Sequence, residues 1–196
     1  MKFDSGRLID IRIAHPEGDR KITVRWPTDE EWCEYSSRRQ VLIRQLGPAE
    51  TETEVSGAED AALELLKRIQ QEGPELDKYE AAWVVERLSR AQVTDVRRED
   101  DAIVVEMRVP GGMVAHRLRV PTLAEVAAYR RSFARLIDRR GGRQLLRVNL
   151  SASGQLYDKV AVGTEGYESP APIIHKAAAI SELLAFLEEE SGLGEA

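Results

Sequence analysis

The side chains of this chain that could carry chemistry are few and lie far apart in the sequence. Its histidines are His15, His116 and His175, and Cys33 is its single cysteine. No HxxxH or CxxC spacing occurs, so a metal site would need ligands gathered from distant elements. We therefore expect no metal site.

Cys33 is surrounded by acidic residues, with Glu30, Glu31 and Glu34 close by in the sequence. A reactive thiol needs positive surroundings and a neighbouring base, and carboxylates work against both. We interpret Cys33 as a small, partly buried residue. Because one cysteine cannot form an intramolecular disulfide, the sequence also indicates a reducing compartment.

Motifs for nucleophilic or phosphate chemistry are missing from the sequence. There is no GxSxG elbow, no GxxxxGK[ST] loop and no GxGxxG turn after a strand. The glycine pairs 111–112 and 141–142 fit a hairpin turn and the end of a helix. We expect no catalytic residues and no cofactor.

One segment has a strong local charge bias, although the whole chain of 196 residues has a net charge of -6. Residues 129–147 are rich in arginine, and Arg131, Arg135 and Arg139 have the i, i+4, i+8 spacing of one helix face. Such a stripe can contact phosphates, form a protein interface or remain solvated. The negative net charge argues against extensive nucleic-acid binding.

The first half of the sequence predicts a hairpin followed by helices. LIDIRIA and RKITVRW alternate apolar and polar residues around a PEGD turn, which is typical of two paired strands. Thr28 and Glu31 have capping-box spacing, and an apolar stripe predicts a helix that ends at Gly47-Pro48. AETETEVSG is interpreted as a loop, and helices are expected over 58–74 and 75–91.

The second half repeats this pattern. Strands are expected at VTDVRRED, AIVVEMRV and MVAHRLRV, then a helix capped by Thr122 and Glu125 that ends at Gly141-Gly142. RQLLRVNL is a further candidate strand, SASGQLYDKVAVGTEGYESPAP is interpreted as irregular, and HKAAAISELLAFLEEE is expected to be a closing helix.

The two halves also share residues. Without gaps, residues 25–47 and 119–141 are identical at these positions: Arg25/Arg119, Pro27/Pro121, Thr28/Thr122, Glu31/Glu125, Tyr35/Tyr129, Leu42/Leu136, Ile43/Ile137 and Gly47/Gly141. We interpret this as a duplicated hairpin–helix unit. The sequence predicts an α+β fold of two pseudo-repeated units, 1–92 and 93–196, and leaves open whether they form one domain.

A hairpin that leads into a Pro-Thr-capped helix, together with LYDKV, EGY and a proline shortly before IIHK, resembles small proteins encoded among tailed-phage structural genes. Tail assembly chaperones are the nearest named class. The resemblance implies a small non-enzymatic protein of the cytoplasm or the virion, with a β element, helices and other phage structural proteins as partners.

The leading functional hypothesis is therefore a structural or assembly protein that acts through protein–protein contacts. A homo-oligomer is one of the assemblies that this hypothesis allows. Trp83, Ile173 and Ile174 are the candidate apolar docking residues, with the arginine stripe attracting an acidic partner. Two alternatives stay open: a nucleic-acid-binding adaptor, and an enzyme whose site gathers His116 or His175 beside carboxylates. No apolar run is long enough for a signal peptide or a membrane span, so we expect no membrane partner.

Overall fold

The fold is α+β, as the sequence predicts. The computed structural model describes residues 2–16, 18–45, 51–140 and 143–190, and over these residues it contains six helices and three antiparallel sheets. The chain divides into two compact units. Unit 1 consists of Met1–Asp4, Ser89–Arg130 and Ser151–Ala196, and unit 2 of Ser5–Leu88 and Arg131–Leu150. The proposed boundary between residues 92 and 93 stays a prediction, and the two units interleave along the chain.

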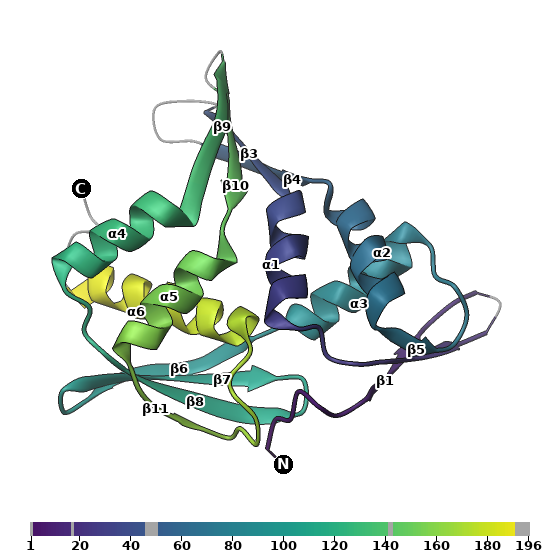
Figure 1. Cartoon of the computed structure of the whole chain (residues 1–196), viewed down its shortest axis with the longest axis horizontal. Coiled ribbons are helices and arrows are strands. Elements are labelled where there is room, and N and C mark those ends of the chain that lie inside the picture. The colour runs from purple at the N-terminus through teal and green to yellow at the C-terminus, as the bar shows by residue number, and fades with distance from the viewer. Residues whose placement is uncertain (1, 17, 46–50, 141–142, 191–196) are drawn as a thin grey trace. The chain divides into compact units, whose positions relative to one another are not determined.

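Unit 1 is a four-stranded sheet with helices on one face (Figure 1). The strand order is β11-β8-β7-β6. Its elements are β6 (Gln92–Glu99), β7 (Ala102–Val109), β8 (Gly112–Arg119), β11 (Ala161–Glu165), α4 (Leu123–Phe133, whose last turn is assigned to unit 2), α5 (Leu150–Val160) and α6 (Ile173–Glu190).

The core of unit 1 follows from the alternation of β7 and β8. Cross-strand register pairs Ile103 with Leu118 and Val105 with His116, and all four side chains are buried. Because strand side chains alternate between faces, these pairs line the same face of the sheet. Leu183 of α6 is also buried, and α6 contacts both β6 and β7.

Unit 2 contains two smaller sheets, with strand orders β1-β2-β5 and β4-β3-β10-β9. Its elements are β1 (Ile9–Ile13), β2 (Arg20–Val24), β3 (Gln40–Gln45), β4 (Thr51–Ser56), β5 (Gln70–Glu72), β9 (Ala134–Arg140), β10 (Arg143–Val148), α1 (Asp29–Arg38), α2 (Ala58–Ile69) and α3 (Lys78–Ser89). The sheet of β3 and β10 joins chain segments from both halves of the sequence.

The structure corrects five sequence-based assignments. The helix predicted over 58–74 ends at Ile69, and residues 70–72 form strand β5. The two capped helices are shorter than predicted: α1 ends at Arg38 and α4 at Phe133, and each is followed by a strand, β3 or β9. The expected loop around residues 51–56 is strand β4, and the expected irregular segment contains helix α5 and strand β11. Strand β3 also pairs with β10, which lies far along the chain, so local pattern did not reveal that contact.

The predicted capping boxes are confirmed at both capped helices. Thr28 Oγ1 accepts from the Glu31 N–H at 3.2 Å, and Glu31 accepts from the Thr28 N–H at 2.9 Å. Thr122 and Glu125 repeat the exchange, with the Thr122 N–H donating at 2.8 Å. Each exchange satisfies backbone donors that a helix start leaves without an intrahelical partner.

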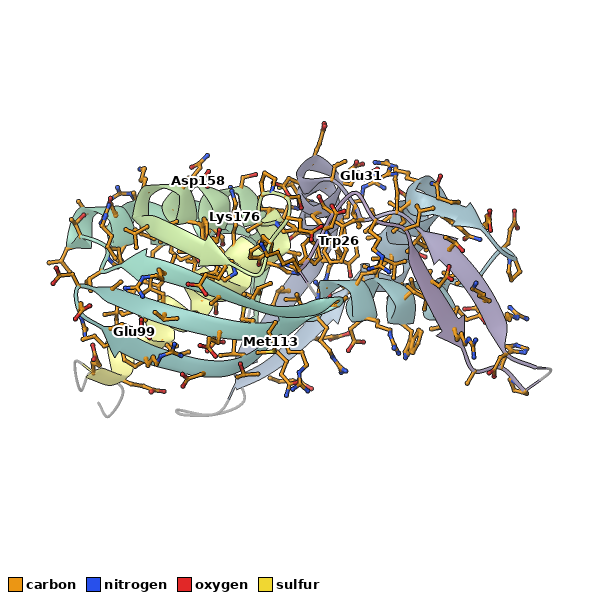
Figure 2. All side chains as sticks on the ribbon, turned by 90° about the horizontal axis from the view of Figure 1, so that it is seen from below. Trp26, Glu31, Glu99, Met113, Asp158 and Lys176 are labelled. Atoms are coloured by element: carbon orange, nitrogen blue, oxygen red, sulfur yellow. The ribbon has the colours of Figure 1, made fainter. Side chains whose placement is uncertain are left out.

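An arginine pairs with the glutamate of each cap: Arg25 directly follows β2, and Arg119 is the last residue of β8. Arg25 donates to Glu31 at 2.6 Å and to the Arg68 carbonyl at 3.3 Å, and Arg119 donates to Glu125 at 2.7 Å and to the Lys159 carbonyl at 3.0 Å. Figure 2 shows Glu31 near Trp26, at the start of α1. The bidentate guanidinium lowers the pKa of each glutamate to about 2.

The order of elements also recurs. Hairpin β1–β2, helix α1, hairpin β3–β4, helix α2, strand β5 and helix α3 are matched in order by β7–β8, α4, β9–β10, α5, β11 and α6. In both series the single strand pairs with the second strand of the first hairpin. Strand β6 has no counterpart in the first series. The duplication itself stays a prediction.

Thr28→Ala is expected to lower the free energy of unfolding by about 1 kcal/mol, because the alanine leaves the Glu31 N–H without its acceptor. Thermal unfolding followed by circular dichroism measures the change. Thr28→Ser keeps the hydroxyl and serves as the control, so it should recover most of the loss. Equal melting temperatures for the alanine variant and the parent would show that the cap does not contribute.

Candidate functional site

Helix α3 starts with a third capping box. The carboxylate of Asp77 accepts from the N–H groups of Tyr79 and Glu80 at 2.8 and 2.9 Å, and Glu80 accepts from the Asp77 N–H at 3.1 Å. Glu80 also pairs with Arg20 of β2 at 3.1 Å. These bonds fix the residue at which α3 begins, and the pair with Arg20 fixes which side of the helix faces the β1–β2 hairpin.

The two sides of α3 differ sharply in character. Ala81, Val84, Val85 and Leu88 are buried, as expected for the apolar stripe of a surface helix. On another side, Tyr79 is 66% exposed and Trp83, one turn further on, is 41% exposed. Trp83 is one of the docking residues proposed from the sequence, and its exposure leaves it accessible to a partner.

Cations flank the exposed rings. The Lys78 ammonium lies 5.1 Å from the centroid of the Tyr79 ring, and the Arg87 guanidinium lies 5.4 Å from that of Trp83. Arg90 follows at the C-terminal end of the helix and is exposed. Over the part of the chain that the structure describes, no carboxylate lies within ion-pair distance of these cations. Together Lys78, Tyr79, Trp83, Arg87 and Arg90 form what we call the α3 surface.

The α3 surface has the chemistry of a binding site for a macromolecule. Aromatic rings bury large areas on contact, and tryptophan, tyrosine and arginine dominate the energetics of protein interfaces. Cations that lack intramolecular carboxylate partners can pair with acidic groups of a second molecule.

The arginine stripe predicted on a helix is not on a helix. Arg131 lies in the last turn of α4 and is exposed, whereas Arg135 and Arg139 lie in strand β9. The prediction was wrong because the helix ends at Phe133, where its chain becomes a strand that pairs with β10. The spacing of these arginines therefore defines no common helix face.

Ile173 and Ile174 form the first turn of α6. Ile173 is 7% exposed, and a Cβ added to Gly154 of α5 would lie 3.3 Å from its Cδ1 atom, so Ile173 packs closely on that glycine. Ile174 is half-buried. Of the predicted docking residues, Trp83 is the one that the structure places on an exposed side of a helix with other candidate binding residues.

Two of the histidines meet in a buried cluster of unit 1. His116 Nδ1 lies 2.7 Å from the Tyr157 hydroxyl, and His116 Nε2 lies 3.0 Å from the Tyr167 hydroxyl. The same Tyr167 hydroxyl lies 3.2 Å from His175 Nδ1. Both histidines are fully buried. We call His116, Tyr157, Tyr167 and His175 the His–Tyr cluster.

Burial changes the acid–base properties of this cluster. Loss of hydration, together with a smaller contribution from the charge of Lys176, lowers the pKa of His116 to about 4. Burial lowers the pKa of His175 to about 3, with His116 contributing. Burial also raises the pKa of both phenols. Both imidazoles are therefore neutral at neutral pH.

The geometry of other candidate sites is less specific. A small surface hollow between α1 and α2 is lined mainly by charged residues, among which Glu34 pairs with Arg38 and Arg68. No histidine lines it. Within the described ranges, no group of three or more histidine, cysteine or acidic side chains is arranged to hold a metal ion. Cys33 is half-buried in α1.

No helix in the described part of the chain is both long enough and apolar enough to cross a membrane.

Comparisons with known proteins add no relative to this picture. No family model matches the chain, and neither a curated protein nor a solved structure is significantly similar to it.

Proposed function

We propose that this protein is a non-enzymatic assembly protein that binds another protein through the α3 surface. The observation that carries the proposal is the exposure of Tyr79 and Trp83 on one helix, beside cations without ion-pair partners among the described residues. Residues one helical turn apart are neighbours on a helix surface, and contiguous exposed apolar patches mark interaction sites.

The chemistry of the surface specifies its partner. Lys78, Arg87 and Arg90 favour a partner segment rich in aspartate or glutamate, and the two rings favour apolar side chains within that segment. An acidic amphipathic helix meets both requirements. Because the sequence pattern resembles proteins encoded among tailed-phage structural genes, we propose a phage structural protein as this partner and a role in virion assembly.

The test is a comparison of bait proteins in extracts of cells that produce the phage structural proteins. Wild type, Trp83→Ala and Leu123→Ala are immobilised, and bound proteins are identified by mass spectrometry. Leu123 is 90% exposed in α4 and is the matched control, because its removal also takes away exposed apolar area. We expect an acidic protein that wild type and Leu123→Ala retain and that Trp83→Ala loses by at least about tenfold in affinity.

Salt separates the contributions of charge and of apolar contact. Complexes guided by surface charges weaken as salt screens them, while the contact of the rings persists. Retention of every bound protein by Trp83→Ala would contradict the proposal, because the α3 surface would then contribute nothing to binding.

A nucleic-acid-binding adaptor is the second candidate, and one observation favours it. Exposed rings flanked by cations also form a stacking platform for single-stranded bases. Titration with a single-stranded oligothymidylate, followed by tryptophan fluorescence of wild type and Trp83→Ala, distinguishes the two. Strong quenching that depends on Trp83 and falls steeply with salt would replace protein by nucleic acid as the partner.

A further inference from the structure

The first residues of the chain are held on unit 1 by contacts around Phe3. Its N–H donates to the Gly166 carbonyl at 2.7 Å, and its carbonyl accepts from the Glu168 N–H at 2.8 Å. The Phe3 ring meets the rings of Tyr167 and His175 edge-on, with centroids 5.7 and 4.9 Å away. Phe3 is only 3% exposed. Two members of the His–Tyr cluster therefore form part of its binding site.

The hydrogen bonds of the cluster are consistent with neutral imidazoles. A neutral imidazole has one N–H donor and one acceptor, and each hydroxyl has one proton to donate. In one consistent arrangement Tyr157 donates to His116, which donates to Tyr167. Tyr167 then donates to His175. The reverse direction also satisfies every contact.

A further proton breaks this pattern. Added to a nitrogen that accepts from a hydroxyl, it turns that nitrogen into a donor, and the hydroxyl proton loses its acceptor. The new charge is also buried, where an ion lacks the stabilisation that water provides. Closure of the cluster and protonation of its histidines therefore oppose one another.

The charged groups next to the cluster do not favour protonation. The Lys176 ammonium lies 5.4 Å from the centroid of the Tyr157 ring, and its charge acts against a proton on His116. The Asp158 carboxylate is paired with Lys176 at 2.8 Å, and Figure 2 shows the two side chains together on α5 and α6. Each imidazole also disfavours a proton on the other.

The direction of the pH effect follows from these contacts. The ordinary histidine pKa is 6.5, and in the closed cluster it falls to about 4 for His116 and about 3 for His175. Between these values an open cluster binds more protons than a closed one. Acid therefore favours opening, and the stabilisation of the closed form is complete only above the ordinary pKa.

We propose that the His–Tyr cluster is an acid-sensitive latch that holds residues 2–4 on unit 1 at neutral pH and releases them under mildly acidic conditions. Residues 2–4 are the part that leaves, because Phe3 meets the rest of unit 1 through an isolated bridge to Tyr167 and through rings of the cluster itself, whereas β8 lies between β7 and β11 within the sheet. Departure of Phe3 exposes Tyr167 and His175 to water. The proposal does not depend on the α3 surface.

Hydrogen exchange measured by NMR tests the latch in the full chain. The Phe3 and Glu168 amides report on closure of the latch, and the amides of β7 report on the sheet. All rates are corrected for the pH dependence of intrinsic amide exchange. From about pH 7 to about pH 5, solvation of one imidazole is expected to reduce the protection of the Phe3 and Glu168 amides roughly 20-fold. The β7 amides should keep their protection. Glu31 and Glu125, with pKa values of about 2, stay ionised over this range.

The variant His175→Asn removes one titrating group while keeping a polar atom near the position of Nδ1. In this variant, protection of the Glu168 amide should fall by at most about threefold between pH 7 and pH 5, if His175 is the group that becomes solvated. Unchanged protection of Phe3 and Glu168 in wild type would overturn the latch. So would a parallel loss at β7, or an undiminished pH effect in His175→Asn. If that variant does not fold, the wild-type comparison between Glu168 and β7 decides alone.

Discussion

Gly166→Ala is expected to destabilise unit 1 by about 3 kcal/mol or more. Gly166 has a φ of +83°, which side-chain-bearing residues rarely adopt. A Cβ at this position would overlap the Met113 carbonyl oxygen and lie 3.0 Å from Val114 Cα. Both are backbone atoms of β8, so relief requires movement of a strand. The Gly166 carbonyl also accepts from Phe3, and that bond would be displaced as well.

Gly163→Ala is the matched control for this prediction. Gly163 lies within β11, three residues earlier, and an added Cβ would meet side-chain atoms of Arg117 at 3.9 and 4.0 Å, which is ordinary contact. Its effect should stay within about 0.5 kcal/mol. Urea unfolding followed by circular dichroism compares the two variants. Similar losses for both would show that the close approach at Gly166 is not the cause.

Trp32→Ala is expected to lower the free energy of unfolding by about 3–5 kcal/mol. The Trp32 side chain in α1 is fully buried and packs edge-on against Trp26 and Tyr35, with ring centroids 6.1 and 5.9 Å away. Its removal takes away the ring that contacts both of the others and leaves a cavity. Backbone circular dichroism is the suitable measurement, because the variant also lacks a fluorophore.

Two other variants separate burial from aromatic character. Trp32→Phe keeps a ring in the core and should cost less than half as much as Trp32→Ala. Trp83→Ala removes an exposed tryptophan and should change stability by no more than about 0.5 kcal/mol. If Trp83→Ala were as destabilising as Trp32→Ala, the α3 surface would be part of the core, and the proposed function would lose its basis.

The hairpins and helix starts could be predicted from sequence because their determinants are local. Alternation of apolar residues marks β1, β2, β7 and β8, and a threonine followed three residues later by glutamate marks α1 and α4. These signals operate over a few residues, and no distant partner is needed to recognise them.

The end of α1 could not be predicted, because the strand that follows it pairs with a strand from a distant part of the chain. Leu42 and Ile43 continue a helical spacing, yet they lie in β3, where they pair with Leu145 and Gln144 of β10. Helix α5 was missed for a related reason. Gly154 weakens its helical signal, and only the packed structure shows that this position must be small to accommodate Ile173.

The His–Tyr cluster left one faint signal in the sequence. His116 occupies the position between Val114 and Leu118 where the alternation of β8 calls for a buried side chain. Its partners come from α5, α6 and the segment between β11 and α6, so no spacing relates them. Trp83 was proposed as a docking residue from the sequence, whereas the cations beside it and the exposure of Tyr79 were seen only in the structure.

The interleaving of the two units has a consequence for synthesis of the chain. Strand β3 is synthesised early, but its neighbour β10 ends only at Val148. Residues 2–4 of unit 1 likewise bind to Gly166 and Glu168, which are synthesised much later. Neither unit can finish folding on the ribosome until most of the chain has emerged. A product terminated near residue 92 would carry β3 with an open edge, a state prone to aggregation, so premature termination would not release a small working domain.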